Sequence, residues 1–342
     1  MHNRGNPALR AALILPDEEL RSYVVSRLAE TDNVIHSSGA DITVDQLDPV
    51  AGGFDVGQLQ NYDVLLTGWR TPRLPESLSQ LSDRKRYVCH LTGTLRAMIP
   101  RSLVQSSNWA VTNWGTSISR FVSEMNLALL LGVSRRFPQT RRIMETGDGW
   151  KRELPPGTSL FGKRIGLYGY GFIAREFHKL IEPFGMDVYV FDPYIDAASL
   201  TLPIQTVSSL EALFQSSDII SIHAGLTPET ESSVDFRLLS MLPEDGIVIN
   251  TARAGIIEEE SLLKAVQETG LRFGLDVFHK EPLSRASPLV SSLQVICTPH
   301  SAGVVGNQFA RIWATARENL VRFAEGRQLK FVVDELIYER MT

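Results

Sequence analysis

The sequence has little of several features that mark specialised classes of protein. Its only two cysteines, Cys89 and Cys297, lie far apart in apolar runs, so they form neither a disulfide framework nor a cysteine zinc site. No cluster of basic residues occurs and the net charge is −5, which argues against a nucleic-acid-binding surface. No apolar run is long enough to span a bilayer, and the one near the N-terminus is too short for a secretory signal. We therefore expect a protein of the reducing cytoplasm that binds neither a membrane nor nucleic acid and holds no metal.

The chain instead has the composition of a globular protein with room for two domains. Its 342 residues, of which 43% are hydrophobic, suffice for two sizeable cores. From residue 164 onward, short apolar runs alternate with amphipathic stretches, as they do in a doubly wound α/β domain. Strands are predicted at residues 165–168, 187–191, 218–223, 246–250, 273–278 and 294–298. The pattern predicts one parallel sheet of six strands.

The N-terminal part is predicted to be a second α/β domain. Its expected strands are residues 11–15, 64–67, 87–91 and 110–112. The helix expected at residues 119–136 has so apolar a middle that it must be buried, either between two domains or between two subunits. Its surface also predicts a homodimer. A last helix, at residues 308–325, no longer alternates with strands, so we expect it to return to the N-terminal domain, with the ligand cleft between the two domains.

Residues 164–192 contain the strand, tight turn, helix and strand of a βαβ unit. Gly169, Gly171 and Ala174 hold the positions of the G-x-G-x-x-G/A fingerprint. The two glycines allow a tight turn and close approach of a pyrophosphate, and the small third residue lets the helix pack near the strand. The helix N-terminus presents unpaired N–H groups and a positive dipole end to phosphates. In this context the glycines predict a dinucleotide site, whereas a lone glycine motif is as often a plain turn.

An acidic residue follows the second strand of this unit. Asp192 lies 23 positions after Gly169, where a carboxylate would accept hydrogen bonds from the adenosine ribose. The same negative charge would repel a 2′-phosphate. The sequence therefore predicts NAD as the cofactor in preference to NADP.

Three later strands each end in a side chain suited to chemistry. Arg253 follows the strand at 246–250, Glu281 the strand at 273–278, and His300 the strand at 294–298. The carboxyl ends of parallel strands lie at one edge of the sheet, where ligands of such folds bind. Any one of the three is more often structural, but together they supply an anion fork, a carboxylate and a proton donor.

These motifs, in this order and spacing, resemble the D-isomer-specific 2-hydroxyacid dehydrogenase family. The resemblance covers the glycine fingerprint, HAGLTPET from His223, NTARAG, GLDVFHKEP and TPHSAG. It implies two doubly wound domains, one Rossmann-like and one flavodoxin-like, with the active site in the cleft between them. The implied NAD-binding domain is residues 114–303. The implied substrate domain is discontinuous and comprises residues 1–113 and 304–342.

The resemblance also implies roles for individual residues. Arg253 would bind the substrate carboxylate and carbonyl, His300 would act as acid and base with Glu281 as its partner, and Asp276 would lie near the nicotinamide carboxamide. In the N-terminal domain, Leu91, Thr92 and Gly93 match the loop whose amides meet the substrate carboxylate, together with Arg253. The residues predicted to bind the cofactor are Gly169, Gly171, Phe172, Ile173, Asp192, His223, Thr230, Thr251 and Asp276.

The implied reaction interconverts a 2-oxo acid and a D-2-hydroxy acid by hydride transfer, and two alternatives remain open. A formate dehydrogenase shares the architecture but carries Gln at the position of Glu281. A dinucleotide-sensing binding protein, similar to the corepressors of this fold, keeps the same three residues. The family often has a Leu-Pro pair beside the cofactor where this chain has Ala224 and Gly225, which bears on cofactor affinity.

Four further side chains have two interpretations each. Trp69, Trp109 and Trp114 are candidates to line the cleft, although ordinary packing is the commoner fate of a tryptophan. His178, on the helix after the glycine fingerprint, is expected to face solvent or a dimer partner.

Overall fold

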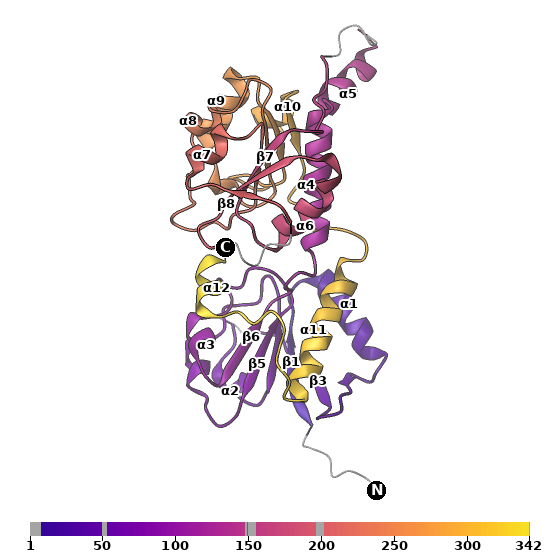
Figure 1. Cartoon of the computed structure of the whole chain (residues 1–342). Coiled ribbons are helices and arrows are strands. Elements are labelled where there is room, and N and C mark those ends of the chain that lie inside the picture. Colours follow the sequence, from indigo (N-terminus) through magenta and orange to yellow (C-terminus); the bar gives the residue numbers. More distant parts are fainter. Residues whose placement is uncertain (1–7, 50–52, 148, 150–154, 196–201, 342) are drawn as a thin grey trace. The chain divides into compact units, whose positions relative to one another are not determined.

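The computed structural model describes residues 8–49, 53–147, 149, 155–195 and 202–341 (Figure 1). The chain divides into two compact units. Unit 1 comprises residues 1–118 and 305–342, and unit 2 comprises residues 119–304.

Unit 1 is built on a six-stranded sheet in the order β2-β3-β1-β4-β5-β6. All neighbours pair in parallel except β2, which is antiparallel to β3. Every residue of β4 and β5 is buried, as expected for parallel strands covered on both faces. The chain leaves β1 toward β3 on one side and β4 toward β5 on the other, so the sheet changes winding direction between β1 and β4. The strands are β1 Leu9–Ile14, β2 Val34–Ile35, β3 Ile42–Gln46, β4 Val64–Thr67, β5 Arg86–His90 and β6 Trp109–Thr112.

Helices cover both faces of this sheet. One core lies under α1 and α11, and a second lies under the short helices α2, α3, η1 and α12. Asp17 caps α1 by accepting from the Leu20 amide at 3.2 Å, as an N-cap carboxylate does. The helices of unit 1 are α1 Glu18–Ala29, α2 Val56–Leu59, η1 Glu76–Gln80, α3 Arg101–Gln105, α11 Gln308–Ala324 and α12 Glu335–Arg340.

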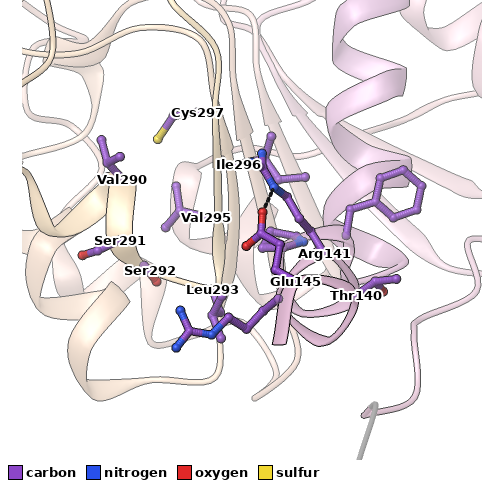
Figure 2. A pocket seen from close by; sticks show the side chains of 13 residues that line it. Thr140, Arg141, Glu145, Val290, Ser291, Ser292, Leu293, Val295, Ile296 and Cys297 are labelled. Atoms are coloured by element: carbon purple, nitrogen blue, oxygen red, sulfur yellow. Dashed lines mark hydrogen bonds and ion pairs between the residues drawn. The ribbon is translucent and has the colours of Figure 1, made fainter. Parts of the chain in front are cut away.

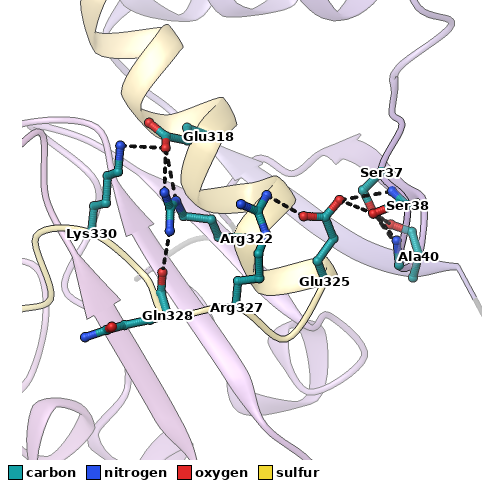
Figure 3. A network of polar contacts seen from close by, with 10 residues as sticks. Ser37, Ser38, Ala40, Glu318, Arg322, Glu325, Arg327, Gln328 and Lys330 are labelled. Atoms are coloured by element: carbon teal, nitrogen blue, oxygen red, sulfur yellow. Dashed lines mark hydrogen bonds and ion pairs between the residues drawn. The ribbon is translucent and has the colours of Figure 1, made fainter.

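The C-terminal segment belongs to unit 1 because α11 packs and bonds there. Glu325, just after α11, accepts from the Ser38 amide at 3.1 Å and from the Ser38 hydroxyl (Figure 3). Gly39 lies so close to the end of α11 that a Cβ there would be 2.2 Å from the Ala324 carbonyl oxygen. Only glycine permits this approach, so the end of α11 packs directly against the segment between β2 and β3.

Unit 2 contains a seven-stranded, fully parallel sheet in the order β13-β12-β11-β10-β7-β8-β9. This is the doubly wound order of a dinucleotide-binding fold with one further strand, and it changes direction between β7 and β10. The strands are β7 Arg164–Tyr168, β8 Asp187–Phe191, β9 Gln205–Thr206, β10 Ile219–Ile222, β11 Ile247–Asn250, β12 Arg272–Leu275 and β13 Val295–Cys297.

The two faces of this sheet carry different helices. One core contains α4 and α6, and the other contains α7, α8, α9 and α10 (Figure 1). The apolar middle of α4 packs against α6, β11 and β12 within unit 2, so the covering that we attributed to a second domain or subunit comes largely from its own sheet. The helices of unit 2 are α4 Ser119–Ser134, α5 Phe137–Thr146, α6 Phe172–Ile181, η2 Glu182–Phe184, α7 Leu210–Gln215, α8 Phe236–Leu239, η4 Ala254–Ile256, α9 Glu259–Glu268 and α10 Pro288–Ser291.

The predicted fold class, two doubly wound α/β domains, is confirmed by the two parallel sheets. The predicted strand at 273–278 is wrong at its end, because β12 stops at Leu275 and Asp276 begins a loop. The strands β2, β3 and β9 and the helix α5 are among the elements that were not predicted. Two polar residues give β9 no apolar pattern to detect. Within the described residues, no helix is long and apolar enough to cross a membrane.

Candidate active site

The glycine loop after β7 has the geometry that a dinucleotide site needs. Gly169 has φ +87°, and a Cβ there would lie 2.8 Å from the Ala224 amide nitrogen, so any other residue would clash with the loop after β10. A Cβ on Gly171 would meet nothing within 4 Å, which leaves open space at the start of α6. Among the described residues, no side chain caps this helix, and a positive dipole end at its N-terminus favours an anion. Phe172 is exposed and Ile173 half-buried in the first turn.

Asp192 lies at the end of β8 beside this loop. One carboxylate oxygen accepts from the Tyr170 amide at 2.8 Å, and the other accepts from the Tyr194 amide at 2.8 Å. The carboxylate therefore fixes the middle residue of the G-x-G turn. Because each oxygen has two lone pairs, it keeps capacity to accept further hydrogen bonds.

The segment after β10 lines the other side of the point where the sheet changes direction. Burial lowers the pKa of the His223 imidazole to about 3, so this side chain is neutral near pH 7. Its Nε2 lies 2.9 Å from the Ser221 hydroxyl. Thr230 donates its hydroxyl to the Gly225 carbonyl at 2.7 Å and accepts from the Thr227 amide at 2.8 Å. Thr230 shapes the loop through contacts within it, whereas His223 bonds back to β10.

The NTARAG loop is held by amide side chains. Asn250 accepts from the Ala252 amide at 3.0 Å and donates to the Arg253 carbonyl at 3.0 Å. Asn126, on α4, donates to the Thr251 hydroxyl at 2.9 Å. Burial lowers the pKa of the Arg253 guanidinium, while the charge of Glu281 acts in the opposite direction. The Arg253 guanidinium is partly removed from water, so it can form strong charge-assisted hydrogen bonds with a bound anion.

His300 and Glu281 form a hydrogen-bonded pair at the carboxyl end of the same sheet. Nδ1 of His300 lies 2.8 Å from Oε2 of Glu281, whose Oε1 accepts from the Phe278 amide at 3.0 Å. Partial burial works to raise the pKa of Glu281, but these hydrogen bonds and the charges of His300 and Arg253 outweigh it, so the pKa lies below its ordinary value. Within the described residues, Nε2 of His300 has no hydrogen-bond partner. The imidazole of His300 is thus oriented through Nδ1, while Nε2 can bond to a ligand.

Glu281 and His300 also line a pocket of about 590 Å³ in unit 2. Its remaining walls are mostly apolar. The lining residues are Phe278, Glu281, Pro282, Leu283, Cys297, Thr298, Pro299 and His300.

Asp276 determines the conformation of the loop that carries His300. Its Oδ1 accepts from the Thr298 hydroxyl at 2.5 Å and the Ser301 amide at 2.9 Å, and its Oδ2 accepts from the Ala302 amide at 2.9 Å. Its carbonyl accepts from the His300 amide at 2.9 Å. His300 has φ +50°, a conformation that non-glycine residues adopt only when neighbours enforce it. The buried carboxylate of Asp276 supplies that enforcement.

The substrate loop implied by the resemblance belongs to unit 1. Leu91 and Thr92 are buried, and the Thr92 hydroxyl lies 2.6 Å from Nε2 of His90. The Gly93 carbonyl accepts from the Asn113 amide side chain at 3.1 Å. The structure thus brings together Arg253, Glu281 and His300 in unit 2, and places the loop at the end of β5 in unit 1.

One residue differs from its expected setting, and one polar contact was not predicted. His178 is not solvent-facing: its side chain is buried, and its Nδ1 lies 2.7 Å from the Tyr170 hydroxyl, because Tyr170 turns inward beneath α6. Asn126 was not recognised, since an asparagine inside a helix has no local signal for a contact with a loop 125 residues later. Among the described residues, no group of three or more His, Cys, Asp and Glu side chains could hold a metal ion.

Comparisons with known proteins agree with this geometry. Residues 127–302 match the family model "D-isomer specific 2-hydroxyacid dehydrogenase, NAD binding domain". The chain is 37% identical over 191 residues to D-3-phosphoglycerate dehydrogenase of Mycobacterium tuberculosis, covering 56% of this chain and 36% of that protein. It is 31% identical over 225 residues to glyoxylate reductase of Aeropyrum pernix, covering 64% of this chain and 67% of that protein.

A solved structure extends the likeness to both units. D-lactate dehydrogenase of Lactobacillus jensenii, determined with NAD⁺, has a TM-score of 0.74 at 21% identity, covering 96% of this chain and 100% of that one, which shows the shared fold. The fold and site define a protein with an NAD-binding domain. The chain belongs to the D-isomer specific 2-hydroxyacid dehydrogenase family, as the sequence predicted, and it spans only about a third of the phosphoglycerate dehydrogenases it matches.

Proposed function

We propose that this protein is an NAD-dependent oxidoreductase that interconverts a 2-oxo acid and a D-2-hydroxy acid. The observation that carries the proposal is the His300 and Glu281 pair, 2.8 Å apart at the carboxyl end of the sheet that also carries the glycine loop and Arg253. An oriented imidazole with one open nitrogen is suited to move a proton to or from a substrate oxygen. NAD(H), when bound, supplies the hydride chemistry that no protein side chain provides.

The residues present fit a dinucleotide. Gly171 leaves room at the start of α6, the helix N-terminus faces that room, and the carboxylate of Asp192 stands beside it. In the proposal, Gly169, Gly171, Phe172 and Ile173 hold the pyrophosphate and Asp192 holds the ribose, which favours NAD over NADP. His223, Thr230 and Thr251 shape the neighbouring loops, and Asp276 is proposed to act mainly through the loop that holds His300.

In the proposed reaction His300, as imidazolium, donates a proton from Nε2 to the carbonyl oxygen during reduction. Glu281 favours the charged form of the ring and fixes its orientation through Nδ1. Arg253 binds the carboxylate with its planar fork and stabilises negative charge that develops on the oxygen. The amides of Leu91, Thr92 and Gly93 are proposed to bind the same carboxylate.

A screen of NADH oxidation with a panel of 2-oxo acids tests the proposal. Sustained turnover with at least one acid supports it. NADH binding without turnover of any 2-oxo acid would favour the alternative, a dinucleotide-sensing binding protein. Reduction of NAD⁺ by formate alone would identify a formate dehydrogenase and contradict the proposal.

We also propose a homodimer in a reducing cytoplasm. A groove of about 820 Å³ is lined by α5 and the segment 290–297. Figure 2 shows the side chains that line it. Phe137 and Met144 on α5 are 60% and 63% exposed, which is unusual for large apolar side chains and supports a partner surface there. Both cysteines, Cys89 and Cys297, are free thiols, as in reduced compartments. Light scattering should show a dimer that Phe137→Glu weakens, while Leu336→Glu, at an exposed leucine of unit 1, serves as control.

A further inference from the structure

Asn126 is a buried amide in the middle of α4 that the fold holds at a cost in free energy. Its side chain is fully buried, and its Oδ1 has no hydrogen-bond partner among the described residues. A buried acceptor without a partner lowers stability, and asparagine is also a poor residue for a helix interior. Such unpaired groups are rare in folded proteins, so each one needs a physical explanation.

The orientation of this amide is fixed by a neighbour on its own helix. Its Nδ2 donates to the Val122 carbonyl at 3.1 Å and to the Thr251 hydroxyl oxygen at 2.9 Å. Because a carbonyl can only accept, the nitrogen must face Val122, and an exchange of the nitrogen and oxygen positions is excluded. Both hydrogens of the Asn126 amide are therefore used, and the Thr251 hydroxyl accepts from Asn126.

This contact leaves the Thr251 hydroxyl with one hydrogen to donate. A hydroxyl has one hydrogen and two lone pairs, and Asn126 occupies a lone pair. Within the described residues, the Thr251 hydroxyl has no other hydrogen-bond partner. Thr251 directly follows β11 and is 8% exposed, at the carboxyl edge of the sheet, where ligands of doubly wound folds bind. Asn126 therefore favours donation by the Thr251 hydroxyl at an edge where a ligand can accept.

The packing of α4 against its sheet is apolar and close without this contact. A Cβ on Gly274 of β12 would lie 2.9 Å from Cβ of Leu129, and a Cβ on Gly132 of α4 would lie 2.8 Å from Cδ1 of Ile296. Glycine at both positions lets the helix approach the strands. A leucine in place of Asn126 would have the same branched shape and no unpaired acceptor. The amide thus costs stability, and what it supplies is a hydrogen bond to Thr251.

The topology of unit 2 indicates which part of a dinucleotide can accept from Thr251. The glycine loop follows β7 and Asp192 follows β8, so the adenosine half belongs to that side of the point where the sheet changes direction. On the other side lie β10 and β11, and Thr251 follows β11. The nicotinamide half belongs to this second side, and its carboxamide carries a carbonyl oxygen that accepts hydrogen bonds.

We propose that Asn126 is a positioning residue for NAD, because it holds the hydroxyl of Thr251 as a donor to the carboxamide oxygen of the nicotinamide. The inference rests on the cofactor binding that is part of the proposed function, and not on the reduction of a 2-oxo acid. Arg253, two residues after Thr251, is held separately, since its carbonyl accepts from the Asn250 side chain.

Binding measurements without any 2-oxo acid test this inference. NADH is compared with ADP-ribose, which keeps the adenosine and the pyrophosphate but lacks the nicotinamide. Asn126→Leu should raise the dissociation constant of NADH by about fivefold, the worth of one neutral hydrogen bond, and leave that of ADP-ribose unchanged. The midpoint of urea unfolding of the free protein should stay the same or rise, because leucine removes the unpaired acceptor. Asn126→Ala removes the same amide without added volume and should weaken NADH binding equally.

Variants of Thr251 and Ser123 complete the design. Thr251→Val removes the hydroxyl and should weaken NADH binding as Asn126→Leu does, whereas Thr251→Ser keeps the hydroxyl and should retain the affinity. The double variant of Asn126→Leu and Thr251→Val should lose no more affinity than either single variant, as expected of two residues that act through one bond. Ser123→Ala is the matched control, because the buried Ser123 hydroxyl donates to the Arg120 carbonyl within α4. It should change the affinity for neither ligand.

The inference is overturned if Asn126→Leu weakens NADH and ADP-ribose equally, or if it lowers the unfolding midpoint and leaves NADH affinity unchanged. Either result would make the contact purely structural. Additive losses in the double variant would show that Asn126 and Thr251 act separately. An unchanged dissociation constant of NADH together with a raised KM for a 2-oxo acid would place the acceptor on the substrate. If the native protein binds NADH but reduces no 2-oxo acid, the proposed reaction fails, and the same binding measurements still decide this inference.

Discussion

The two sheets of this protein share a winding pattern but carry different residues at their carboxyl edges. In unit 2 these are Arg253, Glu281 and His300, which are charged or can titrate. In unit 1 they are the aromatic pair Trp69 and Trp114 beside an uncharged loop. The doubly wound topology provides a place for a ligand in both, and the side chains at the strand ends decide what happens there.

The residues that organise the two edges differ in the same way. Asp276 is a buried carboxylate that accepts from two amides and a hydroxyl, and it holds His300 in a strained conformation. His90 is a buried neutral imidazole that holds a loop through two threonine hydroxyls and a carbonyl. Hydrogen bonds to a charged acceptor are roughly twice as strong as neutral ones. The residue with the stronger hydrogen bonds, Asp276, thus lies beside the strained backbone of His300.

The largest expected effect comes from removing the proposed proton donor. His300→Asn should lower kcat for 2-oxo acid reduction by about a hundredfold or more, because a positioned general acid contributes about that much. Steady-state kinetics measure kcat. The dissociation constant of NADH should stay the same. Wild-type turnover in His300→Asn would remove the residue from the mechanism.

The next effect concerns the buried carboxylate. Asp276→Asn weakens two or three hydrogen bonds and should cost about 1–3 kcal/mol of unfolding free energy, measured with denaturant. It should also lower kcat by about tenfold, as a misplaced His300 would. Thr298→Val removes a single donor to Asp276 and should cost less on both measures. If Asp276→Asn raised only the KM for NADH, the residue would act on the cofactor, as the family resemblance implies.

Cofactor choice is expected to change by about one order of magnitude. Asp192→Ala removes a negative charge next to the glycine loop, so the ratio of kcat/KM for NADPH to that for NADH should rise about tenfold, equivalent to about 1.4 kcal/mol. Asp192→Asn is the control, because it removes the negative charge but keeps a side-chain oxygen that accepts from the Tyr170 amide. Comparing the two variants separates the effect of the charge from the effect of the hydrogen bond that holds the loop. A native protein that prefers NADPH would contradict the role given to Asp192.

The smallest expected effect is a shift in pH dependence. The pKa of Glu281 lies below its ordinary value, so the carboxylate is ionised at neutral pH and favours the protonated ring of His300. Glu281→Gln removes that charge and keeps a hydrogen-bonding side chain. The pH at which the rate of reduction falls should therefore move lower, because the pair loses its negative charge. An unchanged pH profile would mean that the two residues do not act as a pair.

The sequence was sufficient for the features that depend on neighbouring residues. The glycine turn, the acidic residue after the second strand and the apolar strands with Arg253, Glu281 or His300 beyond them were all readable from short patterns. Periodicity and strand length have local physical causes, so the fold class could be predicted and is confirmed. The family, predicted from the resemblance of several motifs, is confirmed as well. The exact end of β12, the polar strand β9 and the helix α5 were missed, since no strong local pattern defines them.

Only the tertiary structure revealed what each polar side chain contacts. The oxygens of Asp276, which the resemblance places near the cofactor, bond to a loop more than twenty residues later in the chain, and no local pattern indicates this contact. His178 lies inside because Tyr170 folds beneath α6, and Asn126 reaches Thr251 from another element. A sequence pattern records which residues are polar, whereas the partner of a buried polar group is set by contacts between distant segments, and those form only when the sheet assembles.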